Sequence, residues 1–278
     1  MLKTNQPGVL IVILNYKTFD LTIKLIEDLR KNLDYDNYSI IVIDNYSTEE
    51  SAAFLRNKSS ELNYIFIANK NNSGYAAGNN IGIRYGIKHG FKYSWILNND
   101  VVIRDGNILK HLISVIEKDA QIACIGPMIY SSKGEICPPY VKRLSLWSMT
   151  LGVYFEKSQR QKHLAESGKV YRVYGCCMLL KNKAMNEVDC MDERTFLYGE
   201  EDLLAERLLK KGYYSYYDAE TSVIHNEASS IKKTNRRKRK QMKETINSLG
   251  IYLKEYRKYP AVARWLCYIT RIIIISLR

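Results

Sequence analysis

Apolar runs alternate with amphipathic segments through the first part of the chain, and this alternation constrains the fold more than any other feature. Apolar stretches rich in β-branched residues occupy 9–14, 39–43, 64–67 and 95–97. Segments with helically spaced apolar residues occupy about 20–31, 49–58 and 78–89. A strand–helix–strand order with short connections requires right-handed crossovers and parallel strands. We therefore expect an α/β fold with a mostly parallel central sheet flanked by helices.

Small polar side chains and one tyrosine follow these runs where the strands are expected to end. They are Asn15, Tyr16, Asp44, Asn45, Ser47, Asn98, Asn99 and Asp100. In an open α/β sheet, ligands bind outside the carboxyl ends of the strands, where Asp and Asn offer acceptors for ribose hydroxyls, an imide N–H or a metal. A hard cation such as Mg²⁺ needs one or two carboxylates when substrate phosphates complete its coordination, so Asp100 alone could suffice.

Two simpler interpretations of these residues stay open. An Asn-Asn-Asp sequence also favours an ordinary turn between two strands. The residues from Asp44 to Ser47 could form a helix N-cap. The cap is compatible with binding, because Ser47 or Thr48 can cap the helix while Asp44 contacts a ligand.

The segment 72–82 is rich in glycine and asparagine and contains Asn72, Gly74 and Asn79. Its glycine spacing matches neither a dinucleotide fingerprint nor a P-loop. Small residues here let the backbone approach a ligand or a neighbouring strand closely. Gly82 and Gly86 lie one helical turn apart, so they could equally form a helix-packing face.

Four short motifs in this order resemble those of family 2 glycosyltransferases, and within that family the rhamnosyltransferase-like members. They are Asn15-Tyr16, Asp44-Asn45-x-Ser47, the segment 72–82, and Asn98-Asn99-Asp100. The resemblance implies a GT-A (Rossmann-like) fold, a nucleotide-diphosphate sugar donor and a divalent metal, Mg²⁺ or Mn²⁺. The implied donor-binding residues are Asn15, Tyr16, Asp44, Asn45, Ser47, Asn72, Gly74, Asn79, Asn98 and Asn99.

The same resemblance assigns roles to three of these positions. Asp44 would face uracil or thymine, and Asn79 would lie near the base or ribose. Asp100 would bind the metal as the last residue of the family's D-x-D motif. Asn98 stands where many relatives have aspartate, so metal binding would depend mainly on Asp100.

Three consecutive carboxylates, Glu200, Glu201 and Asp202, begin a segment with helically spaced leucines. Acids stabilise a helix N-terminus through its dipole. The functional alternative is a general base that deprotonates an acceptor hydroxyl. The segment resembles the family's Glu-Asp motif, with Glu200 at its glutamate and Glu201 at its catalytic aspartate, so Glu201 is favoured as the base and Asp202 is second. Gly175, by the same resemblance, would approach the sugar.

A further apolar run at 222–224 ends at His225. A lone histidine is usually structural. The resemblance matches His225 to a late histidine of the family, which contacts the metal or the diphosphate. A neutral imidazole, the Asp100 carboxylate and two phosphate oxygens could share one ion.

The basic character of the chain is concentrated in its last part. The net charge is +13, and residues 228–278 hold fourteen Lys and Arg against two Glu, a balance of +12. The apolar stretch 265–275 is too short, and too interrupted by Arg271, to span a bilayer. Basic residues beside Trp, Tyr and Ile predict a helix in the membrane interface, held by anionic lipid. Nucleic-acid binding and a solvated basic face are the alternatives; nucleic acid is not expected, because it offers the apolar residues no partner.

We expect a GT-A catalytic domain over 1–227, with a nucleotide-sugar-binding half (1–104) and an acceptor half (105–227), and a basic amphipathic membrane-associating tail over 228–278. The six cysteines suit neither disulfides nor zinc, and no signal peptide follows Met1, so a cytoplasmic protein is expected.

The expected activity is inverting, metal-dependent transfer of rhamnose or a hexose from a dTDP- or UDP-sugar. The acceptor would be a hydroxyl of a lipid-linked glycan at the inner face of the cell membrane, in cell-surface polysaccharide synthesis. The alternative is a catalytically weak nucleotide-sugar-binding scaffold, because Asn98 and Glu201 depart from the family's motifs.

Overall fold

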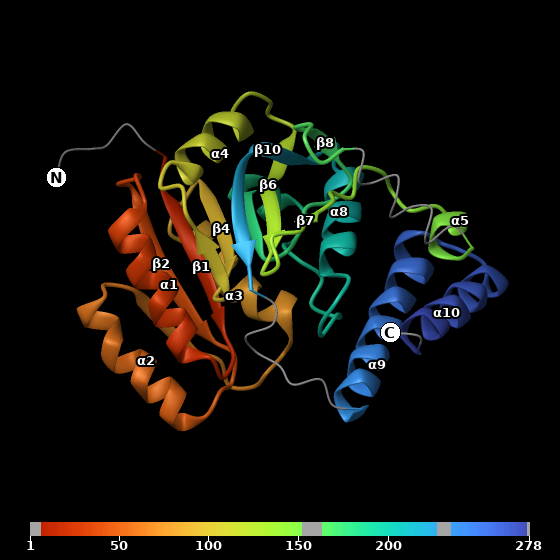
Figure 1. The fold of residues 1–278 in the computed structure, drawn as a ribbon, viewed down its shortest axis with the longest axis horizontal. Coiled ribbons are helices and arrows are strands. Elements are labelled where there is room, and N and C mark those ends of the chain that lie inside the picture. The colour runs from red at the N-terminus through yellow and green to blue at the C-terminus, as the bar shows by residue number, and fades with distance from the viewer. Residues whose placement is uncertain (1–6, 152–162, 227–234, 277–278) are drawn as a thin grey trace.

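One sheet with helices on both faces forms the body of the protein (Figure 1). The computed structural model describes residues 7–151, 163–226 and 235–276. The main strand order is β3-β2-β1-β4-β9-β6-β10-β5. The strands are β1 (Val9–Asn15), β2 (Tyr38–Asp44), β3 (Ile65–Ala68), β4 (Tyr93–Asn98), β5 (Val101–Ile103), β6 (Ile122–Ser131), β7 (Ile136–Cys137), β8 (Gly168–Val170), β9 (Cys177–Lys181) and β10 (Tyr214–His225).

Helices cover the two faces through separate hydrophobic clusters. The helices are α1 (Phe19–Asn32), α2 (Glu49–Glu61), α3 (Tyr75–Lys88), α4 (Ile108–Ile116), α5 (Leu146–Met149), α7 (Asn182–Glu187), α8 (Glu200–Lys210), α9 (Asn235–Ile251), the π-helix η2 (Tyr252–Tyr256) and α10 (Ala261–Ser276). Helices α1, α2 and α4 pack on one face and α3, α7 and α8 on the other. The expected α/β architecture is thereby confirmed.

The first half of the sheet is parallel, as the alternation of strands and helices predicts. β1 pairs in parallel with β2 and β4, and β2 pairs in parallel with β3. The register sets Asn15 opposite Asp44, and Leu14 opposite Asn98. The polar residues that follow these strands therefore gather at one edge of the sheet.

The second half is mixed. β9 runs antiparallel to β4 and β6, whereas β10 is parallel to β6 and antiparallel to β5 and β8. β9 begins at Cys177, directly after a turn formed by Gly175 and Cys176. β6 runs without interruption through Gly126 and Pro127.

Glycines on one side of α3 allow it to lie directly on β1. A Cβ at Gly78 would come 2.5 Å from Leu14 Cδ1, and one at Gly82 would overlap Val12 Cγ1. Gly86 faces Ser94 and Leu10 in the same way. These glycines thus serve helix packing, and this packing fixes the start of α3 beside the ends of β1 and β2.

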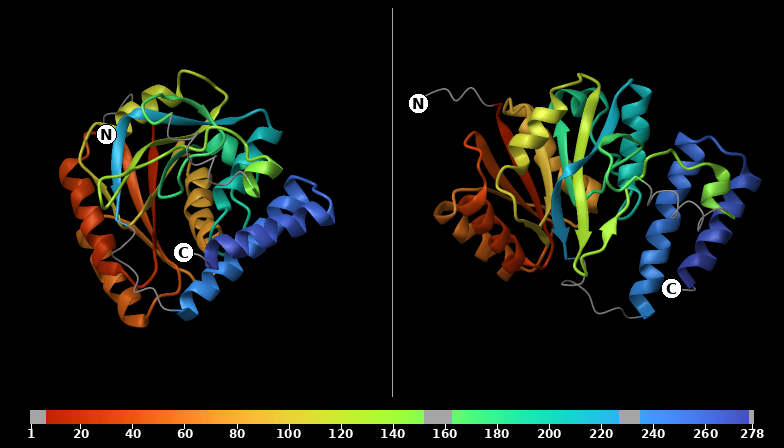
Figure 2. Two further views of the ribbon diagram at one scale, coloured as in Figure 1. Left: turned by 45° about the vertical axis from the view of Figure 1, so that its right-hand side comes forward. Right: turned by 45° about the horizontal axis from the view of Figure 1, so that its top comes forward.

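The C-terminal helices share a core with the body. α9 and α10 lie side by side beyond α8 (Figures 1 and 2). A third cluster joins Leu203 and Ala205 of α8 with Tyr252, Leu253 and Cys267. No described helix is long and apolar enough to cross a bilayer. The expected basic cluster falls partly outside the described residues (Lys232, Lys233), and no side-chain placement is described at 236–240.

We expect Gly82→Ala to lower the free energy of unfolding by about 1–3 kcal/mol, because the added methyl forces α3 away from Val12. Gly168→Ala is the matched control, since a Cβ at Gly168 meets no atom within 4 Å. Urea unfolding of both variants measures the difference. Equal stability of the two variants would contradict the close packing of α3 on β1.

Candidate active site

A buried hydrogen-bond network holds Asp44 at the end of β2. Asn15 donates to Asp44 Oδ1 at 2.6 Å, and the Ser47 N–H donates to Asp44 Oδ2 at 3.0 Å. Asn15 is fully buried and Asp44 is 2% exposed. Each carboxylate oxygen keeps a second lone pair, so Asp44 can accept one further donor. The role of Asn15 visible here is to orient Asp44.

The network continues from Asn15 to the turn that contains Asp100. Thr22 of α1 donates to Asn15 Oδ1 at 2.9 Å. Asn99 donates to Thr22 Oγ1 at 2.9 Å and to Thr18 Oγ1 at 2.8 Å. Asn99 therefore fixes its own turn against α1, and the edge at Asp44 and the turn at Asp100 are joined through buried polar contacts.

The glycine-rich loop is held by Asn45. Its side-chain amide donates to Asn72 Oδ1 at 3.0 Å and to the Gly74 carbonyl at 3.1 Å. Gly74 has a φ of +95°, and a Cβ there would overlap the backbone of Phe196. Only glycine fits this contact, which joins the loop to the segment just before α8.

Asp100 and His225 meet at the same edge, although they come from opposite ends of the domain. Asp100 Oδ1 lies 3.2 Å from His225 Nε2, and both side chains are largely buried. No described protein group forms a hydrogen bond to this oxygen. Adjacent ligands of an octahedral ion at about 2.1 Å lie about 3 Å apart. The pair therefore has the spacing and chemistry of two ligands of one divalent cation.

A turn at Gly175 connects this pair to the acidic helix. The Gly175 N–H donates to Glu201 Oε1 at 3.1 Å, and a Cβ at Gly175 would come 2.6 Å from the same oxygen. Tyr75 donates to the Gly175 carbonyl at 2.7 Å and lies 3.1 Å from Asn98 Oδ1. Burial raises the pKa of Tyr75 well above its ordinary value, so its hydroxyl keeps its proton.

The three acids of α8 have different surroundings. Glu200 is 3% exposed, and burial together with the charges of Glu201 and Asp202 raises its pKa to about 8. Asp202 accepts a hydrogen bond of 2.8 Å from Arg172 in an ion pair. Glu201 is half-buried and bonded to a backbone N–H. Among the three carboxylates, Glu201 is thus the one that is neither fully buried nor in an ion pair.

Three other residues predicted to bind the nucleotide sugar differ in accessibility. Tyr16 is 45% exposed beside the end of β1. Ser47 is half-buried and accepts from the Lys17 N–H at 2.8 Å. Asn79 is fully buried, and its amide donates to the Tyr75 carbonyl at 3.0 Å. Asn79 therefore lies within the α3 packing rather than on the surface of the site.

Comparison of the chain with known proteins identifies its family. Residues 9–189 match the profile of glycosyl transferase family 2. The chain belongs to this family. It is 29% identical over 148 residues to the N-acetylglucosaminyl-diphospho-decaprenol L-rhamnosyltransferase of Mycobacterium tuberculosis, covering 49% of this chain and 48% of that protein. The chain thus spans about half the length of that relative.

Other relatives and solved structures agree with this assignment. The low-salt glycan biosynthesis hexosyltransferase Agl10 of Haloferax volcanii is 25% identical over 222 residues, which cover 78% of this chain and 66% of Agl10. GalNAc-T7 with UDP, GalNAc and Mn²⁺ has a TM-score of 0.65 at 13% identity, over 99% of this chain and 57% of that one. The mannosyltransferase PcManGT from Pyrobaculum calidifontis, with GDP-Man and Mn²⁺, has a TM-score of 0.62 at 13% identity, over 99% and 75%. The expected GT-A fold and the rhamnosyltransferase-like resemblance are confirmed.

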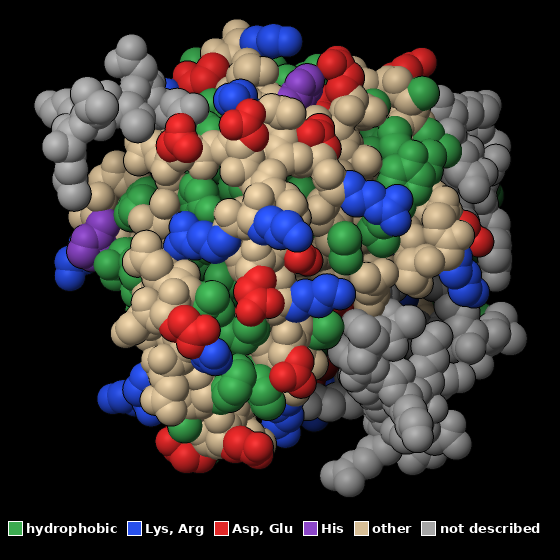
Figure 3. Space-filling model, turned by 60° about the vertical axis from the view of Figure 1, so that its left-hand side comes forward, with side chains coloured by type: hydrophobic (Ala, Val, Ile, Leu, Met, Phe, Trp, Pro, Cys, Tyr) green, Lys and Arg blue, Asp and Glu red, His purple; other side chains and the backbone are tan. Residues whose placement is uncertain are grey.

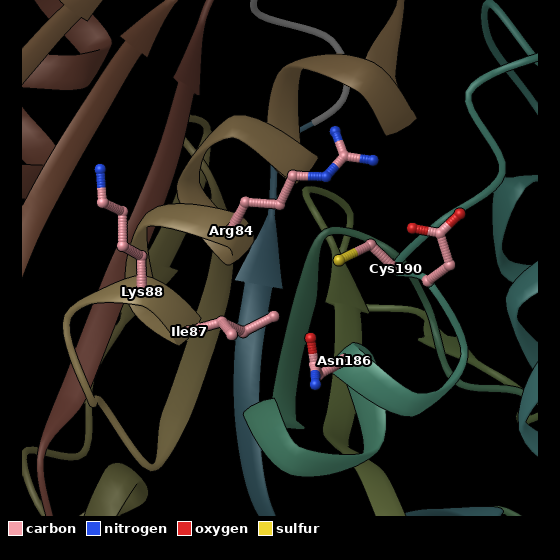
Figure 4. Close-up of a pocket in the computed structure, with 6 residues that line it drawn as sticks. Arg84, Ile87, Lys88, Asn186 and Cys190 are labelled. Carbon is pink, nitrogen blue, oxygen red and sulfur yellow. The ribbon is translucent and has the colours of Figure 1, made fainter.

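Two surface pockets of this family 2 glycosyltransferase lie outside the strand-end network. One of about 280 Å³ lies between α3 and the region of α7 (Figure 4) and is lined by Arg84, Ile87, Lys88, Asn186, Asp189 and Cys190. Another of about 490 Å³ is lined by Val102, Arg104, Tyr130, Ser131, Ser132, Gly134, Ser222, Val223 and Ile224. The second borders the Asp100–His225 pair along β5 and β10, whereas the first is remote from it.

His111, Asp218 and Glu220 form a separate cluster of possible metal ligands. Asp218 lies earlier in β10 than His225, and its Oδ2 already accepts from the Thr221 N–H. The Asp100–His225 pair, by contrast, has an Asp100 oxygen that makes no hydrogen bond with the described residues.

Sequence reasoning missed residues that hold the glycosyltransferase site together. Thr22 links Asn15 to Asn99, and Tyr75 links Asn98 to Gly175. Thr22 shows no local signal, since it is a small residue within an amphipathic helix. Tyr75 stands inside the glycine-rich motif, and its position there was the available clue.

Glu200 makes stability depend on pH. Its folded-state pKa is raised from 4.5 to about 8, so the native protein keeps a proton that the unfolded chain releases. We expect the free energy of unfolding to fall as pH rises between about 4.5 and 8, by at most about 1.4 kcal/mol per pH unit. Glu200→Gln should flatten this decline, as measured by urea unfolding across that range. Glu27→Gln, on the exposed side of α1, is the control, and an unchanged slope in Glu200→Gln would contradict the assignment.

Proposed function

We propose that this glycosyltransferase moves rhamnose or a hexose from a dTDP- or UDP-sugar to a hydroxyl of a lipid-linked glycan, with inversion and with a divalent metal. The observation that carries the proposal is that Cys176, which follows the Gly175 contact with Glu201, forms a side-chain hydrogen bond with His225, the partner of Asp100. These groups come from three distant parts of the sequence. A donor diphosphate beside Asp100 and His225 would place its sugar near Glu201.

The donor base would bind at the end of β2. Asp44 has a free lone pair on each oxygen and could accept the imide N–H of uracil or thymine. Tyr16 and Tyr46 follow Asn15 and Asn45 directly in the sequence, and their rings, 45% and 58% exposed, could offer apolar surface for a base. Asn45, Asn72 and Gly74 would shape the adjoining loop rather than contact the sugar directly.

Asp100 and His225 would hold the metal. When bound, the ion would offset negative charge that develops on the departing diphosphate. Asn98 would not replace the missing aspartate of the motif, because its Oδ1 faces the Tyr75 hydroxyl at 3.1 Å. The Mn²⁺ present with the two structural relatives supports this proposal.

Glu201 would be the general base. Asp202 is already engaged in an ion pair with Arg172. Glu200 is buried and, with its raised pKa, holds its own proton near neutral pH. Glu201 can remove a proton from an acceptor hydroxyl that attacks the sugar from the side opposite the diphosphate. Since this single displacement uses no protein nucleophile, it inverts the anomeric centre.

The proposed acceptor follows from the relatives. The Mycobacterium tuberculosis enzyme is named for an N-acetylglucosaminyl-diphospho-decaprenol acceptor, and Agl10 for glycan biosynthesis. We place this chain at the inner face of the cell membrane, as a peripheral protein of polysaccharide synthesis. The basic segment 228–278 would provide the attraction to anionic lipid.

The donor can be found by thermal unfolding with each nucleotide sugar in the presence of Mn²⁺. We expect a dTDP- or UDP-sugar to stabilise the protein by about 2.7 kcal/mol at a hundred times its Kd, because the donor binds the folded state. Asp100→Asn should lose the part of this stabilisation that requires Mn²⁺. A GDP-sugar as the sole stabilising ligand would contradict the proposed base specificity.

Glu201→Gln separates catalysis from binding. We expect the variant to keep donor stabilisation and to lose sugar transfer by about 10²–10⁴-fold, because the amide cannot accept the acceptor's proton. Glu27→Gln is the control for a neutralised glutamate outside the site. Transfer is measured with radiolabelled donor and a lipid extract as acceptor. Donor binding by the unmodified protein without transfer to any acceptor would favour the scaffold alternative.

A further inference from the structure

Helix α10 is apolar on two sides, and only one side is used for packing. Ala263, Cys267 and Ile274 are buried against the neighbouring elements. A second set is exposed, and we name it the α10 stripe: Val262, Trp265, Leu266, Ile272 and Ile273, exposed by 72%, 60%, 44%, 42% and 52%. Every other described helix carries at most one large apolar side chain with such exposure. The α10 stripe therefore lacks a partner within the described chain.

The spacing of the α10 stripe puts its members on a single side of the helix. At 100° per residue, they fall within an arc of about 120°, well separated from Cys267 and Ile274. Trp147 of α5 and the nearby Leu151, 58% and 80% exposed, add apolar side chains on the element next to α10. These elements form the end of the molecule farthest from α1 and α2 (Figures 1 and 2).

The charge around the α10 stripe decides what could cover it. From Tyr256 to Ser276 the chain contains Arg257, Lys258, Arg264 and Arg271 and no acid. The whole segment 228–278 has a balance of +12. By contrast, the face over α1 and α2 mixes charges of both signs (Figure 3). A partner that is both apolar and anionic fits this end of the molecule.

We propose that the α10 stripe, with Trp147 and Leu151, is a preformed docking surface for the interface of an anionic lipid bilayer. Its apolar side chains would enter the boundary between headgroups and acyl chains, and the cations would lie among the headgroups. With 16 residues α10 is about 24 Å long, shorter than the hydrocarbon core of about 30 Å, so it would lie along the membrane.

Other partners fit less well. A second copy of this chain would bring two segments of +12 together, and their repulsion opposes an apolar contact. Nucleic acid would satisfy the cations but would leave the apolar side chains in water.

The helix that carries the docking surface packs in one hydrophobic cluster with the acidic helix, because Cys267 of α10 lies with Leu203 of α8. Arg207 of α8 donates to the Tyr256 hydroxyl at 2.9 Å, and the Tyr171 hydroxyl donates to Glu206 at 2.8 Å and lies 3.0 Å from the Tyr252 hydroxyl. Since α8 also carries Glu201, a bilayer at α10 would hold the acceptor side of the site at a fixed orientation to the membrane. This consequence depends on the proposed lipid-linked acceptor, whereas lipid binding itself does not.

Vesicle co-sedimentation tests the proposal without donor or acceptor, so its outcome is independent of the proposed reaction. The full chain should bind vesicles of phosphatidylglycerol and phosphatidylcholine much better than phosphatidylcholine alone. Trp265→Ser combined with Ile273→Ser should weaken this binding by about tenfold or more, because two large apolar side chains no longer leave water. Phe54→Ser, an exposed apolar residue of α2, is the matched control and should bind as the unmodified chain does.

Two further measurements keep the result unambiguous. Thermal unfolding must give the double variant the stability of the control, which excludes loss of fold. The sequence has three tryptophans, of which Trp95 is buried and Trp147 and Trp265 are exposed. In a Trp147→Phe variant, Trp265 is therefore the one exposed tryptophan, and its fluorescence emission should shift to the blue when anionic vesicles are added. Unchanged vesicle binding in the double variant would overturn the proposal. The proposal would also be overturned if light scattering showed the unmodified chain to be a dimer and the double variant to be a monomer.

Discussion

The contact between Asp100 and His225 is the constraint on which the arrangement of the site depends. It exists because β10 returns antiparallel to β5 and sets His225 opposite Val101. A shift of this pairing by one residue would turn His225 to the other face of the sheet. Two reversals, at β9 and at β6, leave β10 pointing in the same direction as β1 and β4, so His225 at its C-terminal end lies at the edge where those strands also end.

Buried polar side chains connect this pair to the donor side. Asn15 satisfies Asp44 and accepts from Thr22, and Thr22 in turn accepts from Asn99. An unpaired buried group in such a network costs about 1–3 kcal/mol, so each member keeps the others in one geometry. Asp100 Oδ1 differs from the members of this network, because it makes no hydrogen bond with the described residues and instead lies in an ion pair with His225. This oxygen therefore has lone pairs to offer the cation that we propose.

The amino-acid pattern predicted the parallel strands and their polar ends well, because both follow from local periodicity and from the meeting of parallel strands at one edge. It gave no indication of the turn that Gly175 and Cys176 form before β9. That turn is determined by contacts with Tyr75 and Glu201, which are distant in the sequence. The pattern also gave no indication that Tyr252 and Leu253 of the predicted tail are buried with α8. Periodicity shows that a helix has an apolar side but does not show which element covers it.

The glutamate at position 201, where the family has aspartate, is explained by the same turn. The Glu201 carboxylate extends to the Gly175 N–H, and a side chain shorter by one methylene would fall short of that donor from the same backbone position. Gly175 must lack a Cβ for the carboxylate to lie there. A bond to the backbone orients the carboxylate and leaves its other oxygen available. Under the proposal that Glu201 is the base, this departure from the resembled motif keeps an oriented carboxylate at the site, which favours a transferase over a scaffold.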